Sequence, residues 1–306
     1  MAYKLYINNK LFNGIGNNNY NKGTIAINGT IYQFDNSTSV ATQFNIYYHY
    51  LQPKSQAVNT YTVNDGYVID VSDIPTLTNT DYLLDGYYYD SSFTTPVTAG
   101  DIISNNTDIY LNWISKTYLF KIQGTYRNVN VDFATILNTK YLSEFYLLYT
   151  NSSSNVNLNN NTQSVSYNNG DEQIDFTGYI FSEQSKSNSA QLKISDGKYV
   201  VFTPNMSGKI KFYYRVSSSD DWYSAIPSAS GGSICIAADT GSNIPASSYD
   251  IDNNTPTTPP VYLDNRVYES KYFTVNANQK YYVFLNAAST RPIPRMVIFG
   301  FKFVAD

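Results

Sequence analysis

Residues 85–101 read DGYYYDSSFTTPVTAGD, a stretch that joins three consecutive tyrosines to a turn-forming Ser/Thr/Pro cluster. Pro96 has no N–H for a sheet and helps to set the chain direction, so we expect a strand to end before it. A small domain has little room for a core of aliphatic side chains alone. Because large aromatic side chains bury roughly 150–250 Å² each, we expect Tyr88, Phe93 and Trp113 to supply much of that core.

Apolar and polar residues alternate along much of the remaining chain, which is the pattern of half-buried strands. Residues 24–34 (TIAINGTIYQF) predict a hairpin that turns at Asn28-Gly29. Residues 60–71 (TYTVNDGYVIDV) predict two strands joined at Asp65-Gly66. Further strands are expected in FNIYYHY (44–50), TDIYLNW (107–113), AQLKISDGKYVVFTP (190–204), KIKFYYRV (209–216), GSICIAA (232–238), KYFTVNANQKYYVFLNA (271–287) and RMVIFGFKFVAD (295–306).

One segment leaves two alternatives open. Residues 131–150 (VDFATILNTKYLSEFYLLYT) carry Phe133, Ile136, Leu137 and Leu142 at roughly helical spacing, while the aromatic second half also suits a strand. Elsewhere, strands separated by frequent Gly, Asn, Asp and Pro turns favour a β-sandwich or jelly roll. The sequence therefore predicts a mostly all-β fold.

Residues 44–113 resemble a single Listeria–Bacteroides repeat, the small β-grasp module of internalin-type surface proteins. The segments YTVNDGYVIDVSDIP and DGYYYDSSFTTPVTAGDIISNNTDIYLNW carry the resemblance. Tyr87 departs from the family pattern, which has tryptophan at this position. The resemblance implies a β-grasp fold and a role as a spacer or protein-contact unit. The matching residues are Gly86, Tyr88, Asp90, Phe93, Thr94, Thr95, Pro96, Tyr110 and Trp113.

Residues 116–306 resemble the β-sandwich carbohydrate-binding-like modules appended to Bacteroides polysaccharide-related proteins, through LKISDGKYVVFTPNMSGKIKFYYRVSSSDDW and VYESKYFTVNANQKYYVFLNA. This second resemblance implies a jelly-roll-like sandwich and transfers no binding residue. Three regions are therefore expected. They are an N-terminal β segment that serves as a docking arm (1–40), a β-grasp module (41–115) and a β-sandwich domain (116–306).

The charge content is low and argues against several kinds of partner. The chain has 20 basic and 24 acidic residues, a net charge of -4 and no basic run. Nucleic acid and anionic membranes are therefore not expected as main partners. No stretch approaches the roughly 18 apolar residues of a membrane helix. The first residues lack the pattern of a signal peptide, so we expect either release outside the secretory route or a chain whose leader has been lost.

The residue types of catalytic and metal sites are sparse. His49 is the sole histidine, and the sole cysteine, Cys235, lies in an apolar strand where a buried thiol is expected. The acidic clusters single out no carboxylate pair of the kind that glycoside hydrolysis needs, roughly 5–9.5 Å apart. We therefore predict no catalytic residue, metal or cofactor. The acidic residues in question are Asp171, Glu172, Asp175, Asp220, Asp221, Asp250 and Asp252.

Tyrosine is abundant, with 31 residues, and aromatic rings can stack on sugars. The segment SSSDDWYSA places Trp222 and Tyr223 beside Asp220 and Asp221, which makes it the best sequence candidate for a glycan site. The competing interpretation is that tyrosines pack across strands or at subunit contacts.

Three classes of function follow from these features. The first is a non-enzymatic structural protein of a bacteriophage virion, assembled in the host cytoplasm. It would be a head fibre, capsid decoration or tail accessory subunit that contacts other virion proteins, copies of itself and a host-surface glycan. The second is a bacterial cell-surface adhesin or polysaccharide-binding module. The third, a glycan-degrading enzyme, lacks an identifiable carboxylate pair.

Overall fold

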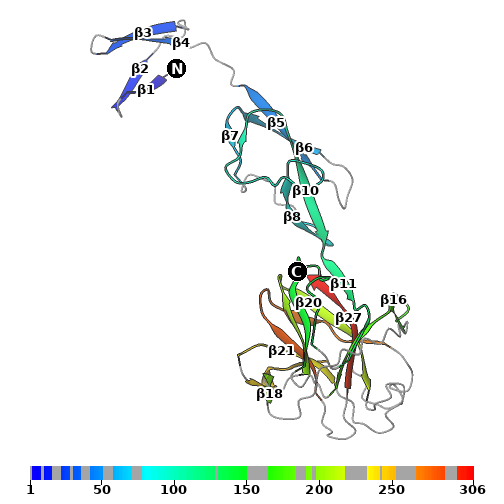
Figure 1. The fold of residues 1–306 in the computed structure, drawn as a ribbon. Coiled ribbons are helices and arrows are strands. Elements are labelled where there is room, and N and C mark those ends of the chain that lie inside the picture. The colour runs from blue at the N-terminus through cyan, green and yellow to red at the C-terminus, as the bar shows by residue number, and fades with distance from the viewer. Residues whose placement is uncertain are drawn as a thin grey trace. The chain divides into compact units, whose positions relative to one another are not determined.

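The computed structural model describes residues 2–7, 10–15, 22–27, 30–35, 42–50, 58–70, 78–127, 130–149, 165–183, 191–194, 198–217, 233–241, 243–252, 267–286 and 295–306. In these residues the regular structure is strand, apart from short 3-10 segments such as η3 (Ala246–Ser248) (Figure 1). The prediction of an all-β fold is confirmed. None of the helical segments described is long and apolar enough to cross a membrane.

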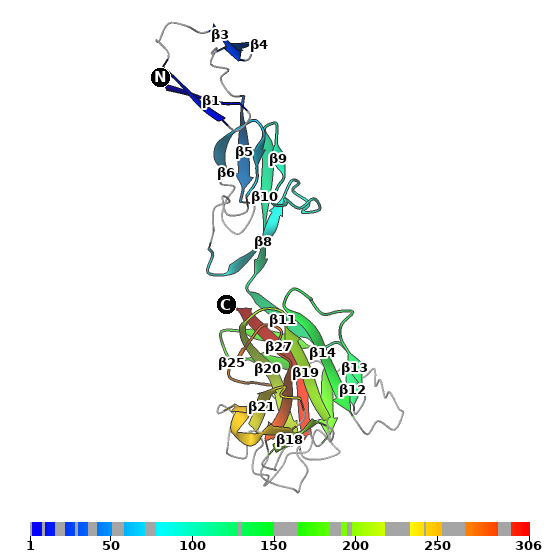
Figure 2. The same ribbon diagram turned by 90° about the vertical axis from the view of Figure 1, so that its left-hand side faces the viewer.

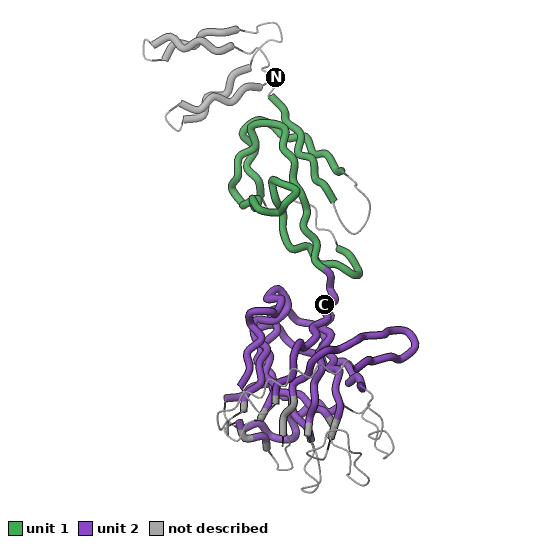
Figure 3. The backbone as a smooth tube through the Cα atoms, turned by 45° about the vertical axis from the view of Figure 1, so that its right-hand side comes forward, with its two compact units in different colours: residues 1–114 green, residues 115–306 purple. Residues whose placement is uncertain are grey.

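The chain divides into two compact units, residues 1–114 and residues 115–306 (Figure 3). The first unit begins with two antiparallel hairpins, one formed by β1 (Ala2–Ile7) and β2 (Lys10–Ile15) and one by β3 (Lys22–Ile27) and β4 (Thr30–Asp35). Ile27 pairs with Thr30. Two residues therefore connect β3 to β4, and the hairpin predicted at Asn28-Gly29 is confirmed.

A four-stranded sheet follows, in the order β6-β5-β10-β8. Its strands are β5 (Gln43–His49), β6 (Val58–Asn64), β8 (Tyr82–Tyr88) and β10 (Thr107–Ser115). The two central strands, β5 and β10, are parallel, whereas β5 and β6 are antiparallel. Numbered within the sheet, this order is 2-1-4-3, with a parallel central pair.

Asp65 and Gly66 join two strands that do not pair with each other. β6 pairs with β5, while β7 (Tyr67–Val68) pairs with β9 (Ile102–Ile103) in a separate ladder. The Asp65 N–H donates to the Thr42 carbonyl and the Gly66 N–H to the Ile103 carbonyl. Gly66 has a φ of +77°, a backbone conformation that favours glycine. The chain therefore changes sheets at this turn.

The core of this unit is formed by Ile46, Tyr48, Ile69, Ile103, Ile109 and Leu111. The strand predicted at residues 107–113 and the expected core contact of Trp113 are confirmed, because Ile109 and Leu111 are buried and Trp113 packs against the same cluster. The three tyrosines divide their roles. Tyr87 and Tyr89 pack against the core, whereas the Tyr88 ring meets the Phe93 ring at 5.5 Å between centroids. The expectation that Tyr88 and Phe93 supply this core is therefore wrong, because both are only partly buried and pack against each other.

The second unit is built on two large sheets (Figure 2). The seven-stranded sheet contains β11 (Thr117–Lys121), β12 (Thr125–Arg127), β17 (Tyr179–Glu183), β20 (Gly208–Ser217), β24 (Tyr268–Glu269), β25 (Phe273–Val275) and β27 (Arg295–Ala305). The six-stranded sheet contains β13 (Val131–Asp132), β14 (Leu142–Tyr149), β19 (Lys198–Pro204), β21 (Ser233–Ala238), β23 (Asp250–Ile251) and β26 (Tyr281–Asn286).

Aromatic rings hold these two sheets face to face. Phe145 of the six-stranded sheet lies 5.4 Å from Phe120 and 4.9 Å from Phe301 of the seven-stranded sheet, measured between ring centroids. Phe202 and Phe212 meet across the same gap at 5.8 Å. These rings are almost fully buried, so the second unit has the interior of a β-sandwich.

Each large sheet is also covered on its outer face by a two-stranded sheet. The hairpin β15 (Val165–Asn168) and β16 (Gln173–Phe176) packs Tyr167 and Phe176 against Tyr213 of β20. The pair β18 (Gln191–Lys193) and β22 (Asn243–Pro245) covers the other sheet, where Cys235 is fully buried. Strands buried on both faces need near-continuous apolar sequences, as in YVVF and MVIFGF.

Within residues 131–150, for which the sequence suits either a helix or a strand, the chain forms a single turn followed by a strand. The Leu137 N–H donates to the Phe133 carbonyl at 3.0 Å, which closes a single helical turn. β14 then pairs with β19, and it buries Leu142, Phe145 and Leu147. The helical interpretation of residues 131–150 is therefore wrong beyond that turn, because long-range pairing with β19 outweighs the local spacing.

Gly300 permits a close backbone approach in the sandwich. It lies in β27 beside Lys121 of β11, and a Cβ built on it would overlap the Phe120 carbonyl oxygen and press on the Phe176 ring. The neighbouring oxygen belongs to the backbone and cannot swing away. Glycine at this position thus allows β11 and the outer hairpin to lie against β27.

Gly300→Ala is expected to destabilise the second unit by about 2–3 kcal/mol through overpacking. In thermal unfolding followed by circular dichroism, this corresponds to a fall in Tm of about 5 °C or more. Gly241→Ala is the comparison, because its added Cβ has no neighbour within 4 Å and only its φ of +100° opposes the change. An equal effect of the two substitutions would contradict the overlap at Phe120.

Candidate functional site

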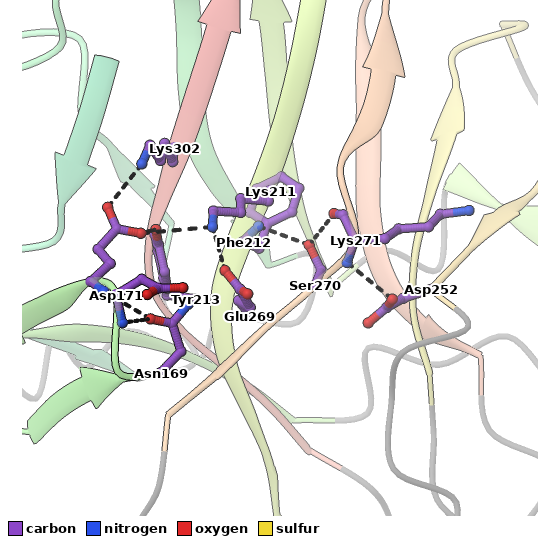
Figure 4. A network of polar contacts seen from close by, with 11 residues as sticks. Asn169, Asp171, Lys211, Phe212, Tyr213, Asp252, Glu269, Ser270, Lys271 and Lys302 are labelled. Carbon is purple, nitrogen blue, oxygen red and sulfur yellow. Dashed lines mark hydrogen bonds and ion pairs between the residues drawn. The ribbon is translucent and has the colours of Figure 1, made fainter. Parts of the chain in front are cut away.

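The predicted glycan residues Asp220, Asp221, Trp222 and Tyr223 lie outside the described residues. Of the acidic clusters, the structure places Glu172 in a charged network on the outer face of the seven-stranded sheet and buries Asp252 at the edge of the other sheet (Figure 4). The described residues contain two candidate sites. They are this charged network in the second unit and a polar sheet face in the first.

The charged network begins with two lysines on neighbouring strands. Lys211 of β20 and Lys302 of β27 are directly opposite cross-strand partners, an arrangement that is unfavourable for like charges. Glu172 lies between them, with its carboxylate 2.8 Å from the Lys302 amine and 3.8 Å from the Lys211 amine. Glu269 forms a second ion pair with Lys211. Two carboxylates therefore balance two ammonium groups.

The turn between β15 and β16 holds Glu172 in position. The Asn169 side-chain oxygen accepts hydrogen bonds from the Asp171 N–H at 3.0 Å and the Glu172 N–H at 2.8 Å. The Asn168 side chain accepts from the N–H of Gly170, whose φ is +95°. This turn lies in the hairpin that covers the sheet, so the network also anchors the hairpin.

Aromatic rings enclose the buried ammonium group. Lys211 is only 7% exposed, and its amine lies 5.4 Å from the Tyr213 ring centroid and 5.2 Å from that of Tyr272. Such cation–π contacts are strongest where water is excluded. The Tyr213 hydroxyl donates to Glu172 at 3.3 Å.

Electrostatics keep the central carboxylate ionised. Burial acts to raise the pKa of Glu172, but the hydrogen bond and charge of Lys302, together with the charge of Lys211, lower it overall. Burial and the nearby Glu172 charge raise the pKa of Tyr213. A carboxyl group that acts as a general acid in glycoside hydrolysis needs a raised pKa. Glu172 has the opposite electrostatics, which suits a structural anchor.

Asp252 forms a second polar anchor beside this network (Figure 4). It is fully buried and accepts hydrogen bonds from the Tyr214 hydroxyl and the Lys271 N–H, each at 3.1 Å. Its own N–H donates to Ile234 of β21. Because Tyr214 belongs to β20, these bonds connect the two large sheets. In the part of the chain that the structure describes, no group of three or more His, Cys, Asp or Glu side chains could hold a metal ion.

The Asp90 turn shows a structural role for Asp90, Phe93, Thr94 and Thr95. The Asp90 carboxylate accepts backbone hydrogen bonds from Ser92 at 3.0 Å, Thr94 at 3.2 Å and Thr95 at 2.7 Å. Desolvation acts to raise the pKa of Asp90, but the bonds from Thr95 and Thr94 lower it overall. Phe93 has a φ of +57°, which is uncommon for a residue other than glycine. The carboxylate therefore fixes a tight turn.

The outward face of the four-stranded sheet is the better candidate for binding. Register places Tyr47 beside Asp108 and His49 beside Tyr110 on adjacent parallel strands. The His49 ring stacks on the Tyr110 ring at 4.6 Å and 14°, and its Nε2 lies 2.7 Å from the Asp108 carboxylate. The sequence did not indicate a binding role for His49, because its partner Asp108 is 59 positions away and no local pattern reports the parallel pairing of the two strands.

Amide and hydroxyl groups extend this face and hold one another in place. Asn45 donates to the Tyr47 hydroxyl at 3.3 Å and accepts from Thr62 at 2.9 Å, while Asn112 donates to Asp85 at 3.0 Å. The face therefore presents aromatic rings beside fixed donors and acceptors. This chemistry suits an uncharged sugar, in which C–H groups stack on a ring while hydroxyls form hydrogen bonds.

Comparisons with known proteins give little further information. No protein-family model matches the chain, and no match is found among curated proteins. Among solved structures, the functional form of the mosquito-larvicidal Cry4Aa toxin from Bacillus thuringiensis aligns with a TM-score of 0.19 and 11% identity. The alignment covers 86% of this chain and 52% of the toxin chain, so this chain spans about half the length of that protein. Similarity at this level carries no conclusion about fold or function.

Glu172→Gln is expected to lower the free energy of unfolding of the second unit by about 1–3 kcal/mol at pH 7. The substitution leaves Lys211 and Lys302 opposite each other with only one carboxylate. Urea unfolding of the full chain would measure the loss. Asp175→Asn is the matched control in the same hairpin, because that exposed carboxylate accepts a bond from Ser166 and should matter little.

The pH dependence of the unfolding free energy tests whether charge pairing causes this loss. The pKa of Glu172 is lower in the folded protein than its ordinary value of 4.5, so its stabilisation is complete above pH 4.5 and is lost as the pH falls through the folded pKa. The difference between wild type and Glu172→Gln should therefore shrink in acid. A difference that stays constant down to about pH 2.5 would show that charge pairing is not responsible.

Proposed function

We propose that this chain is a non-enzymatic structural subunit of a bacteriophage particle, such as a head fibre, capsid decoration or tail accessory protein. The proposal rests on the way the chain is divided into hairpins and units. The first unit begins with two hairpins, each of the two units has its own core, and the charged groups of the described network balance one another. The resemblance of residues 44–113 to a spacer or protein-contact module supports the same class of protein.

The observation that carries the proposal is that the first four strands form two separate two-stranded sheets. β1 pairs with β2 and β3 with β4, and each pair is a two-stranded sheet. An isolated two-stranded sheet is at best marginally stable in water. A partner that adds strands to the free edges would stabilise both hairpins, and strand addition is a common mode of protein recognition. Residues 1–40 therefore suit a docking arm on a shell protein.

Purified particles from the source culture are expected to contain the chain in stoichiometric copies when compared with cell-envelope fractions by quantitative mass spectrometry. Deletion of residues 1–40 should remove the chain from particles. The remaining units should keep their strand signal in circular dichroism, since each has its own core. Absence from particles with enrichment in the envelope would overturn the proposal. Retained attachment of the truncated chain would overturn the docking arm.

A second candidate function is glycan binding by a bacterial surface adhesin or polysaccharide-binding module. The polar face of the four-stranded sheet favours it, because His49, Tyr110 and Asp108 combine ring surfaces with a carboxylate. Such a face would equally serve a phage protein that contacts the surface of its host.

Binding to a glycan array would test this second function with two variants, Tyr110→Ala on the sheet face and Trp222→Ala in the loop singled out by sequence. Selective loss in Tyr110→Ala is expected if the sheet face binds. Selective loss in Trp222→Ala would move the site to the loop. Wild-type protein that binds no glycan would contradict the second function altogether.

A further inference from the structure

The edge strand β6 differs from the other edges of the large sheets that the structure describes. It ends the four-stranded sheet and pairs only with β5 among the described strands. Its sequence, VNTYTVN, contains neither charge nor proline, and six of its seven side chains are exposed. Val58 is 46% exposed and Tyr61 41% exposed. An uncharged, exposed edge strand is a template for pairing with another strand.

The other edges are protected in recognisable ways. Of the strands that end the two large sheets, β12, β24, β25, β13 and β23 are only two or three residues long, and the five-residue β11 carries the charged Lys121. The far edge of β8 carries Asp85 and is covered near its end, where Val97 donates to Tyr87 and Tyr88 pairs with Pro96. Protection of this kind prevents pairing at sheet edges.

The sequence of β6 is close to self-complementary about Tyr61. If two copies pair in antiparallel fashion with Tyr61 opposite Tyr61, then Thr60 lies opposite Thr62 in both halves of the ladder. Asn59 then faces Val63, and Val58 faces Asn64. Threonine pairs and aromatic pairs across strands are stabilising.

In this register, residues that lie opposite each other in the two copies also belong to the same face of the sheet. Residues an even number of positions apart along a strand point to the same side. Opposite residues in the ladder are 60 with 62 and 58 with 64, so each polar-face position meets a polar-face position. Tyr61, which meets Tyr48 at 5.3 Å on the core side, meets its own copy. The face that carries His49 would therefore continue unbroken into the second copy.

We propose that β6 is a homodimer interface, in which two copies of this chain pair through this edge about a two-fold axis. The occupant of the edge is a second copy, because the strand complements itself in both register and face. A two-fold contact uses the same surface on both partners and closes after two subunits. The dimer does not depend on the particle function proposed above.

Light scattering coupled to size exclusion would test the dimer on the full chain, over about 1–200 µM protein. Wild type is expected to dimerise. Thr60→Lys combined with Thr62→Lys places like charges opposite each other twice and should raise the Kd about tenfold or more. Both positions are exposed, so folding should persist, and circular dichroism would verify it.

The register itself is tested by a matched variant. Thr60→Lys combined with Thr62→Glu changes the same two positions but places opposite charges across the two-fold axis, so dimerisation should return. A wild type that stays monomeric would overturn the proposal. So would a double-lysine variant with wild-type affinity, which would place the contact elsewhere, or a folded Lys/Glu variant that stays monomeric, which would exclude this register.

Discussion

The second unit depends on one backbone ladder, the antiparallel pairing of β20 with β27. Ten residue pairs join these strands, and a bulge between Tyr213 and Tyr214 leaves Phe299 as an extra residue. β11 and β17 then pair along the free edge of β27, while β24 and β25 pair along that of β20. Two strands far apart in the sequence thus act as the template for the whole seven-stranded sheet.

The ladder also imposes a charge constraint that the rest of the unit meets. It brings Lys211 and Lys302 side by side beneath a covering hairpin, where unpaired ammonium groups would be costly. The hairpin that buries them also supplies Glu172, and the short strand β24 supplies Glu269. Burial and neutralisation therefore come from the same elements. This coupling explains why the chain, with few charges, places several of them under cover.

Local sequence patterns predicted the strands well, and long-range pairing explains what they missed. Asn28-Gly29 predicted the antiparallel pairing of β3 with β4, and Ile109 and Leu111 alternate with outward residues along β10 and are buried. Phe133 to Leu142 followed helical spacing, but pairing of β14 with β19 decided the outcome. The contact of His49 with Asp108 and Tyr110 depends on a parallel register between distant strands, which no local pattern reports. The glycan site predicted in the Trp222 loop stays a prediction.

The parallel central pair of the first unit has a mechanical consequence. The chain enters the four-stranded sheet through β5 and leaves it through β10, and these strands are hydrogen-bonded neighbours that run in the same direction. Tension on the two ends therefore pulls the strands in opposite directions along their length. The evenly spaced bonds between them share the load simultaneously, whereas the bonds of a hairpin open one after another. Tension between the two ends of the sheet thus loads the pairing of β5 with β10 in shear along the strands.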